Sequence, residues 1–201
     1  MGLSLRIDDR ALIPRPETEE MTEEILARFR DKKSLNVLDL GTGSGAIAIA
    51  LARFLVEPSV TAVDKSAHAL ELARENAEAN DLEDKIEFHE SDWFSEVAEK
   101  FDIIVSNPPY VASSELGELK KEIKDHEPID ALDGGKDGLR EIETILTGAG
   151  DHLEEDGVIF LEIGYDQGES VVEFGSDQNF KEVELLEDSG GKDRIFFGVK
   201  G

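Results

Sequence analysis

Val37-Leu38-Asp39-Leu40-Gly41-Thr42-Gly43-Ser44-Gly45 is followed directly by an apolar run that reaches Leu55. An apolar strand, a glycine loop and an apolar helix in this order are typical of a ligand-binding βα unit. Glycine permits the tight turn and lets a ligand approach the backbone closely. The spacing is G-x-G-x-G, which differs from the G-x-G-x-x-G spacing of dinucleotide-binding proteins. The stretch therefore predicts an α/β fold with a ligand at this loop.

On both sides of the loop, strand-like and helix-like segments alternate, which favours a mostly parallel sheet. We predict strands at residues 3–7, 36–40, 60–64, 85–89, 101–106, 158–163, 183–186 and 194–199. Helices are predicted at residues 17–30, 45–55, 66–80, 116–124 and 138–153, with a Gly- and Asp-rich loop at 129–139. The last two strands should pair antiparallel around Ser189-Gly190-Gly191. The chain is thus predicted to have one central sheet covered by helices.

The composition limits the classes of function. The chain has 201 residues, no cysteine and a formal net charge of -26. Such a charge repels phosphate backbones and anionic membranes, so nucleic acid is an unfavoured substrate. We find no signal peptide and no apolar stretch of membrane-spanning length, and we expect a cytoplasmic protein. The acidity itself is explained either by solubility or by adaptation to high salt.

Acidic and aromatic residues around the loop suggest which ligand binds there. Asp39 precedes Gly41 by two positions and can receive a cation or a water, while Asp64 ends the next strand and can bind ribose hydroxyls. Asp92 and Trp93 follow the third strand, where they can contact an adenine ring. S-adenosylmethionine, with its ammonium and sulfonium, suits this set. NAD, a tight turn with a solvated acid, and a core role for Trp93 remain open alternatives.

A second motif, Asn107-Pro108-Pro109-Tyr110, stands at the carboxyl end of the predicted strand 101–106. Two prolines make the turn stiff. The Asn107 side-chain oxygen and the Pro108 carbonyl can each accept one N–H of an NH2 group, and Tyr110 can stack on the flat group that carries it. The turn therefore indicates methylation of a planar amide or amine, without a metal or a histidine base. A plain proline turn is the alternative interpretation.

Four blocks together resemble the release factor glutamine methyltransferases, also called the HemK or PrmC family. They are Leu12-Ile13-Pro14-Arg15-Pro16-Glu17-Thr18-Glu19, the glycine loop, Val105 to Val111, and Glu127-Pro128 through Asp137-Gly138-Leu139. The resemblance implies a Rossmann-like class I fold, with a seven-stranded, mostly parallel sheet whose last strand is antiparallel. It implies methylation of the N5 amide of the glutamine in the Gly-Gly-Gln motif of peptide-chain release factors.

The resemblance also assigns roles to residues. Gly41, Gly43, Gly45, Asp64, Trp93 and Asn107 would contact the cofactor, together with Asp39, Thr42, Ser44 and Asp92 from the reasoning above. Asn107, Pro108, Pro109 and Tyr110 would hold the glutamine. Pro14, Arg15, Pro16 and Glu17 would shape the substrate entrance.

Members of the family usually carry a small helical N-terminal domain, and this sequence begins almost at the hairpin that would follow it, so we expect either a catalytic fragment or a short homologue. We expect residues 1–30 to form a hairpin remnant and a helix, and residues 31–201 the methyltransferase domain. Two rival functions remain open. One is methylation of an exocyclic amino group of adenine or guanine in nucleic acid, and the other is a non-catalytic module that binds S-adenosylmethionine. We expect a monomer in either case.

Overall fold

The computed structural model describes residues 2–121, 123, 127–178 and 180–201. Its strands are β1 (Asn36–Leu40), β2 (Ser59–Asp64), β3 (Ile86–Glu90), β4 (Phe101–Ser106), β5 (Leu153–Glu162), β6 (Phe180–Glu187) and β7 (Asp193–Lys200). They form one seven-stranded sheet in the order β3-β2-β1-β4-β5-β7-β6. Strand β7 runs opposite to the other six strands and pairs antiparallel with β5 and β6. The predicted fold class is therefore confirmed.

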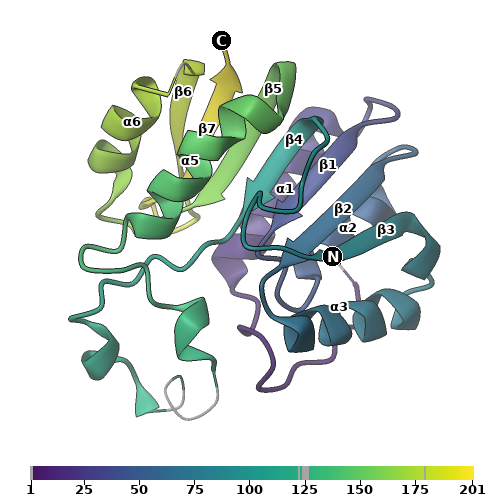
Figure 1. The fold of residues 1–201 in the computed structure, drawn as a ribbon, viewed down its shortest axis with the longest axis horizontal. Coiled ribbons are helices and arrows are strands. Elements are labelled where there is room, and N and C mark those ends of the chain that lie inside the picture. Colours follow the sequence, from purple (N-terminus) through teal and green to yellow (C-terminus); the bar gives the residue numbers. More distant parts are fainter. Residues whose placement is uncertain (1, 122, 124–126, 179) are drawn as a thin grey trace.

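Helices cover both faces of the sheet (Figure 1). Their bounds are α1 (Pro16–Phe29), α2 (Ala46–Phe54), α3 (Ala67–Ala79), α5 (Arg140–His152) and α6 (Gly168–Ser176), with short 3₁₀ turns at Glu83–Lys85, Leu116–Glu118 and Ile129–Ala131. The apolar side chains of α1 and α2 share one core cluster, and those of α5 and α6 share another. None of the described helices is long and apolar enough to cross a membrane.

Strand β4 shows why the sheet is buried on both faces. Ile103 and Val105 belong to the core cluster under α1 and α2, and Ile104 belongs to the cluster under α5. Alternate side chains of a strand point to opposite faces, so a strand between two helical layers reads as a continuous apolar run. Strands β1 to β4 are parallel, so their carboxyl ends share one edge. The residues after these strands are thereby brought together.

Several predicted elements need correction. Residues 3–7 do not form a strand; their backbone is bound by side chains of α3. Within the segment predicted as a helix over 116–124, the structure has the 3₁₀ turn Leu116–Glu118 and helical conformation at Lys121 and Ile123, while residues 122 and 124 lie outside the described part. Strand β5 begins five residues before the predicted Val158, at Leu153. Helix α6 was not predicted at all.

Candidate active site

The glycine loop after β1 turns sharply beneath the neighbouring strand. The N–H groups of Gly41 and Thr42 both donate to the Val63 carbonyl, at 2.9 Å each. Gly45 has a φ of 83°, and a β-carbon there would stand 3.1 Å from the Ala73 β-carbon of α3. Residues with a β-carbon rarely adopt this φ, and two β-carbons rarely approach each other this closely. The glycine thus allows α2 to start directly from the loop and to pack closely on α3.

Asp39 lies fully buried beneath the loop. Its Oδ2 accepts hydrogen bonds from Thr42 Oγ1 at 2.6 Å and from the Ala48 N–H at 3.1 Å. Burial raises the pKa of Asp39 to about 7. Its Oδ1 has no hydrogen-bond partner among the described residues. These contacts tie the loop to the first turn of α2, so the structure gives Asp39 a supporting position, and its predicted contact with the cofactor stays a prediction.

Asp64 closes β2 and faces the glycine loop. Its Oδ2 accepts from the Gly43 N–H at 2.9 Å, and its Oδ1 accepts from the Ser66 N–H at 2.8 Å. Burial raises the pKa of Asp64, while the two backbone N–H groups lower it. Each carboxylate oxygen has a further lone pair, so both can still accept a hydroxyl hydrogen from a ligand. This is the geometry that a ribose diol needs.

Trp93 follows β3 and covers the start of the glycine loop. It has a φ of 49°, and its Nε1 donates to Glu141 Oε2 on α5 at 2.8 Å. Its neighbour Asp92 also lines the central cavity. The hydrogen bond to α5 fixes the plane of the indole beside the loop. An aromatic face and a carboxylate are thus available for a planar base.

These residues surround a cavity of about 510 Å³. That volume lies within the range of about 300–1,000 Å³ found for small-molecule sites. The structure brings to its wall the predicted residues Pro14, Gly41, Thr42, Gly43, Ser44, Asp64, Asp92, Trp93, Asn107 and Pro109. Outside the lining lie the predicted residues Arg15, Pro16, Glu17, Asp39, Gly45, Pro108 and Tyr110.

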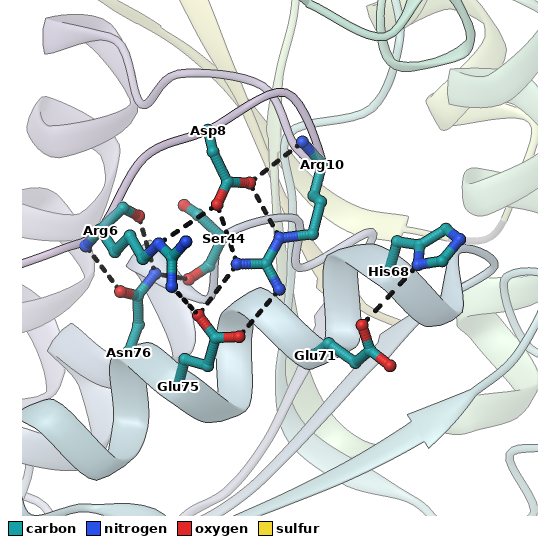
Figure 2. Close-up of polar contacts among 8 residues, drawn as sticks. All are labelled: Arg6, Asp8, Arg10, Ser44, His68, Glu71, Glu75 and Asn76. Carbon is teal, nitrogen blue, oxygen red and sulfur yellow. Dashed lines mark hydrogen bonds and ion pairs between the residues drawn. The ribbon is translucent and has the colours of Figure 1, made fainter.

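The N-terminal segment, residues 4–11, contacts α3 through Arg6 and Arg10 (Figure 2), and its contribution to the cavity wall was not predicted from the sequence. Arg10 and Ala11 line the cavity, and the Arg10 guanidinium is held by Asp8 at 2.8 Å and by Glu75 of α3 at 2.9 Å. Asn76 donates to the Ser44 carbonyl of the glycine loop at 2.8 Å. The segment, α3 and the loop are therefore one bonded unit. The sequence carries no local signal for contacts between positions this far apart.

Asn76 and Asn80 hold the backbone of this segment. Asn76 accepts from the Arg6 N–H at 2.6 Å and donates to the Arg6 carbonyl at 3.1 Å. Asn80 makes the same pair of contacts with Ser4, at 3.4 Å and 2.9 Å. Two side chains of one helix thus take the place of a neighbouring strand. This explains why an extended segment forms at residues 4–6 without joining the sheet.

The Asn107 turn contributes Asn107 and Pro109 to the cavity wall. Asn107 Nδ2 donates to Thr18 Oγ1 of α1 at 2.9 Å. Thr18 Oγ1 in turn donates to Glu162 Oε2 at 2.5 Å, and the Tyr110 hydroxyl donates to Glu162 Oε1 at 3.0 Å. Burial and the nearby Glu162 raise the pKa of Tyr110, which keeps it a neutral donor. The buried carboxylate of Glu162 is therefore hydrogen-bonded directly to Tyr110, at one end of the turn, and through Thr18 to Asn107, at the other end.

The glycine-rich loop at residues 132–138 supports the turn from behind. Val111 donates to the Leu132 carbonyl and accepts from the Gly134 N–H, at 2.9 Å each. A β-carbon on Gly138 would stand 2.3 Å from the Tyr110 carbonyl oxygen. Since no side chain fits there, this glycine permits the close approach of the two loops. The turn is thus rigid on both sides.

An ion pair connects the entrance block, residues 14–17, to Glu127. Arg15 Nη2 lies 2.6 Å from Glu127 Oε1 and 2.8 Å from Glu127 Oε2. Pro16 begins α1, and Pro14 faces the cavity. The carboxylate of Glu17 contributes to raising the pKa of Glu162. Of the four entrance residues, Pro14 therefore lines the cavity and Glu17 acts on the buried carboxylate, and their contact with a substrate stays a prediction.

Comparison with known proteins places this site in a family. The model of the methyltransferase small domain matches residues 16–124. The release factor glutamine methyltransferase of Streptococcus pneumoniae is 47% identical over 195 residues, which cover 96% of this chain and 69% of that protein. The enzyme of the same name from Lactococcus lactis is 47% identical over 194 residues, covering 96% and 71% respectively.

Solved structures agree. The release-factor-specific protein-(glutamine-N5) methyltransferase of Alicyclobacillus acidocaldarius is 27% identical with a TM-score of 0.58, covering 98% of this chain and 99% of that one. The 16S rRNA methyltransferase RsmC of Thermus thermophilus, solved with AdoMet and guanosine, has a TM-score of 0.66 at 22% identity, covering 94% and 44%. The latter likeness shows the shared fold. The identity to the curated relatives extends over nearly the whole chain, and the chain belongs to the release factor glutamine methyltransferase family.

Proposed function

We propose that this protein transfers a methyl group from S-adenosylmethionine to the N5 amide nitrogen of a glutamine in peptide-chain release factors, the glutamine of the Gly-Gly-Gln motif. Family membership supports the reaction. The observation on this chain that carries it is the stiff Asn107 turn at the wall of the cavity, with the Asn107 NH2 group bound to Thr18. That leaves the amide oxygen of Asn107 as an acceptor for a substrate.

The residues around the cavity fit S-adenosylmethionine, which supplies an electrophilic methyl group on its sulfonium. Asp64 would bind the two ribose hydroxyls, and the Trp93 face would cover the adenine ring while Asp92 accepts from its amino group. Gly41 and Gly43, with positive φ, let the backbone come close to the ligand. The loop residues Thr42, Ser44 and Gly45, with Asp39 below them, complete the proposed cofactor site. The ligand has no phosphate, and its ammonium and sulfonium groups are cations that carboxylates of the lining can attract.

The turn would bind and orient the glutamine. An amide nitrogen is a weak nucleophile because its lone pair is delocalised into the carbonyl. Asn107 Oδ1 and the Pro108 carbonyl would each accept one N–H, which draws electron density toward nitrogen and fixes its direction. Such orientation contributes on the order of several kcal/mol to lowering the barrier. Pro109 and Tyr110 would hold the flat amide, and Pro14, Arg15, Pro16 and Glu17 would line its path inward.

We further propose the cytoplasm, where translation terminates, as the location and a monomer as the working form. The large apolar side chains that are exposed in the described part come from separate segments, such as Ile7, Phe54 and Tyr165. Scattered exposed apolar residues are usual for a monomeric surface. Light scattering at assay concentration tests the oligomeric state.

The function is tested with radiolabelled S-adenosylmethionine. A release factor and its variant with Ala in place of the Gly-Gly-Gln glutamine are offered as acceptors, beside total RNA and DNA, at low and high salt. Label on the release factor alone, lost in the Ala variant, is the expected result. Label confined to nucleic acid would establish the rival amino-group methylation. Cofactor binding without any transfer would support the non-catalytic module.

A further inference from the structure

Glu162 is a buried carboxylate at the end of β5 that no step above uses. Its exposed fraction is 0%, and that of Thr18 is 6%. Both of its oxygens are occupied by hydroxyl donors, Thr18 at 2.5 Å and Tyr110 at 3.0 Å. Burying a carboxylate is costly unless donors satisfy it, so the arrangement requires a role that offsets the cost.

The direction of the hydrogen bonds follows from what each group can donate. An ionised carboxylate only accepts, and a threonine hydroxyl has one hydrogen. The hydrogen of Thr18 is used on Glu162. The Thr18 oxygen can therefore only accept from Asn107. It selects the NH2 end of that amide, so the Oδ1 end is turned toward other partners.

This direction matters because an asparagine amide has two possible orientations of nearly equal shape. With Oδ1 toward the substrate, Asn107 accepts an N–H from the glutamine. In the flipped orientation, two NH2 groups would meet as donors and neither would be satisfied. A site with a fixed acceptor also rejects a carboxylate, which has no hydrogen to donate there.

We propose that Thr18 and Glu162 are positioning residues that hold the Asn107 amide with its oxygen toward the substrate, and that they thereby select an NH2 group as the methyl acceptor. The inference rests on the proposed function and names two further residues of the same site. Neither residue is assigned contact with the reacting atoms; both act through Asn107.

Opposing effects act on the pKa of Glu162. Burial raises its pKa, and Glu17 adds to that rise. The hydrogen bonds from Thr18 and Tyr110 and the positive charge of Arg194 lower it. The two hydroxyl donors are partners that an ionised carboxylate can accept from, and they oppose the effect of burial.

The kinetic test compares Thr18→Val, Thr18→Ser and Thr22→Val. Valine has the shape of threonine without the hydroxyl, and serine keeps the hydroxyl. Thr22 is the matched control, because it is also buried on α1 and its hydroxyl donates to the Thr18 carbonyl at 2.9 Å without reaching Asn107. Each variant is assayed for kcat, for KM of the release factor and, by calorimetry, for Kd of S-adenosylmethionine.

We expect kcat of Thr18→Val to fall by about tenfold or more, with the cofactor Kd changed by less than about twofold. Thr18→Ser should stay within about threefold of the parent, and Thr22→Val within about twofold. A Thr18→Val enzyme as active as Thr22→Val, or a Thr18→Ser enzyme as impaired as Thr18→Val, would overturn the proposal.

A second measurement does not depend on catalysis. In the parent protein labelled with ¹⁵N, the Asn107 NH2 signals should exchange slowly with solvent and shift in Thr18→Val, while Thr22→Val leaves them in place. Fast exchange of the Asn107 NH2 protons in the parent would refute the positioning role of Thr18 and Glu162, even if release factors are methylated. If the Asn107 NH2 protons are protected but no release factor is methylated, the positioning role is retained and the proposed function is rejected.

Discussion

Trp93 lies so close to Gly41 that a β-carbon added to the glycine would stand 3.3 Å from the indole Cζ3 atom. Gly41 also has a φ of 69°. The ring that is proposed to cover the adenine therefore rests on a backbone position that has no side chain. This contact links the first and third strand ends of the cofactor site.

Replacing Gly41 by Ala should push the indole away and strain the turn. We expect the Kd for S-adenosylmethionine to rise by about tenfold or more, as calorimetry would measure. Gly150→Ala is the control, because its β-carbon would meet nothing within 4 Å and it lies in α5. That change should leave the Kd unaltered and stabilise the protein by about 0.5–1 kcal/mol. Equal Kd values for both variants would show that the contact between Gly41 and Trp93 does not contribute to cofactor binding.

Asp64→Ala should weaken cofactor binding more than turnover. Its carboxylate is the proposed acceptor of the ribose hydroxyls and also holds the Gly43 and Ser66 backbone. We expect the cofactor Kd to rise about tenfold or more, with kcat at saturating cofactor within about threefold. Asp84→Ala removes an exposed carboxylate and controls for the change in net charge. Unchanged affinity in Asp64→Ala would show that the ribose binds elsewhere.

Asn107→Ala should show the opposite pattern. The variant loses the amide oxygen that would accept the glutamine N–H, and kcat should fall by about a hundredfold or more. The cofactor Kd should change by less than about fivefold, because Asp64 and Trp93 are intact. Single-turnover transfer from labelled cofactor, with calorimetry beside it, separates the two quantities. Full turnover in this variant is incompatible with the proposed mechanism.

Asp39 should make folding stability depend on pH. Its pKa rises from 3.8 to about 7 in the folded state, so the folded protein holds this proton more tightly than the unfolded chain does. Its contribution to the free energy of unfolding therefore falls as pH rises from about 4 to about 7, by about 1.4 kcal/mol per pKa unit at most.

Asp39→Asn abolishes this titration. The difference in unfolding free energy between the variant and the parent should shift in favour of the variant from pH 5 to pH 8. Urea unfolding at both pH values and constant ionic strength measures it, with Asp84→Asn as an exposed control. A difference that stays constant with pH would mean that Asp39 titrates normally.

The central strands β1 and β4 could be predicted from sequence because they are buried on both faces. Strand β4 has the predicted bounds, Phe101 to Ser106, since an unbroken apolar run has one stable place between two helical layers. The glycine loop and the Asn107 turn were predicted for a related reason. Each is a local motif that directly follows a predictable strand.

Helix α6 was missed because its stability comes from tertiary packing. It has nine residues and begins with Gly168, and β-carbons on Gly168 and Gly175 would stand 2.6 Å from Asp193 and Phe196 respectively. These glycines disfavour a helix locally and are required by the close approach to β7. Local propensity and the fold conflict here, and only the folded contacts decide.

The hydrogen bonds that connect Asn107 to Glu162 through Thr18 were not predicted, for a different reason. Thr18 and Glu162 are 144 positions apart, and each lies in a segment whose pattern already explains it as helix or strand. Nothing in either segment indicates a buried polar contact. The geometry of the assembled site reveals it.

Asn76 and Asn80 grip the N-terminal segment at two points, through backbone atoms of Arg6 and Ser4. Four residues of helix advance about 6 Å, and two residues of extended chain advance about 6.6 Å. The distance between the two asparagines along the helix therefore matches the distance between the two backbone positions that they bind. Because these contacts are made to backbone atoms, they depend on the number of residues between positions 4 and 6. Deleting or inserting one residue there would disrupt them more than replacing one side chain by another.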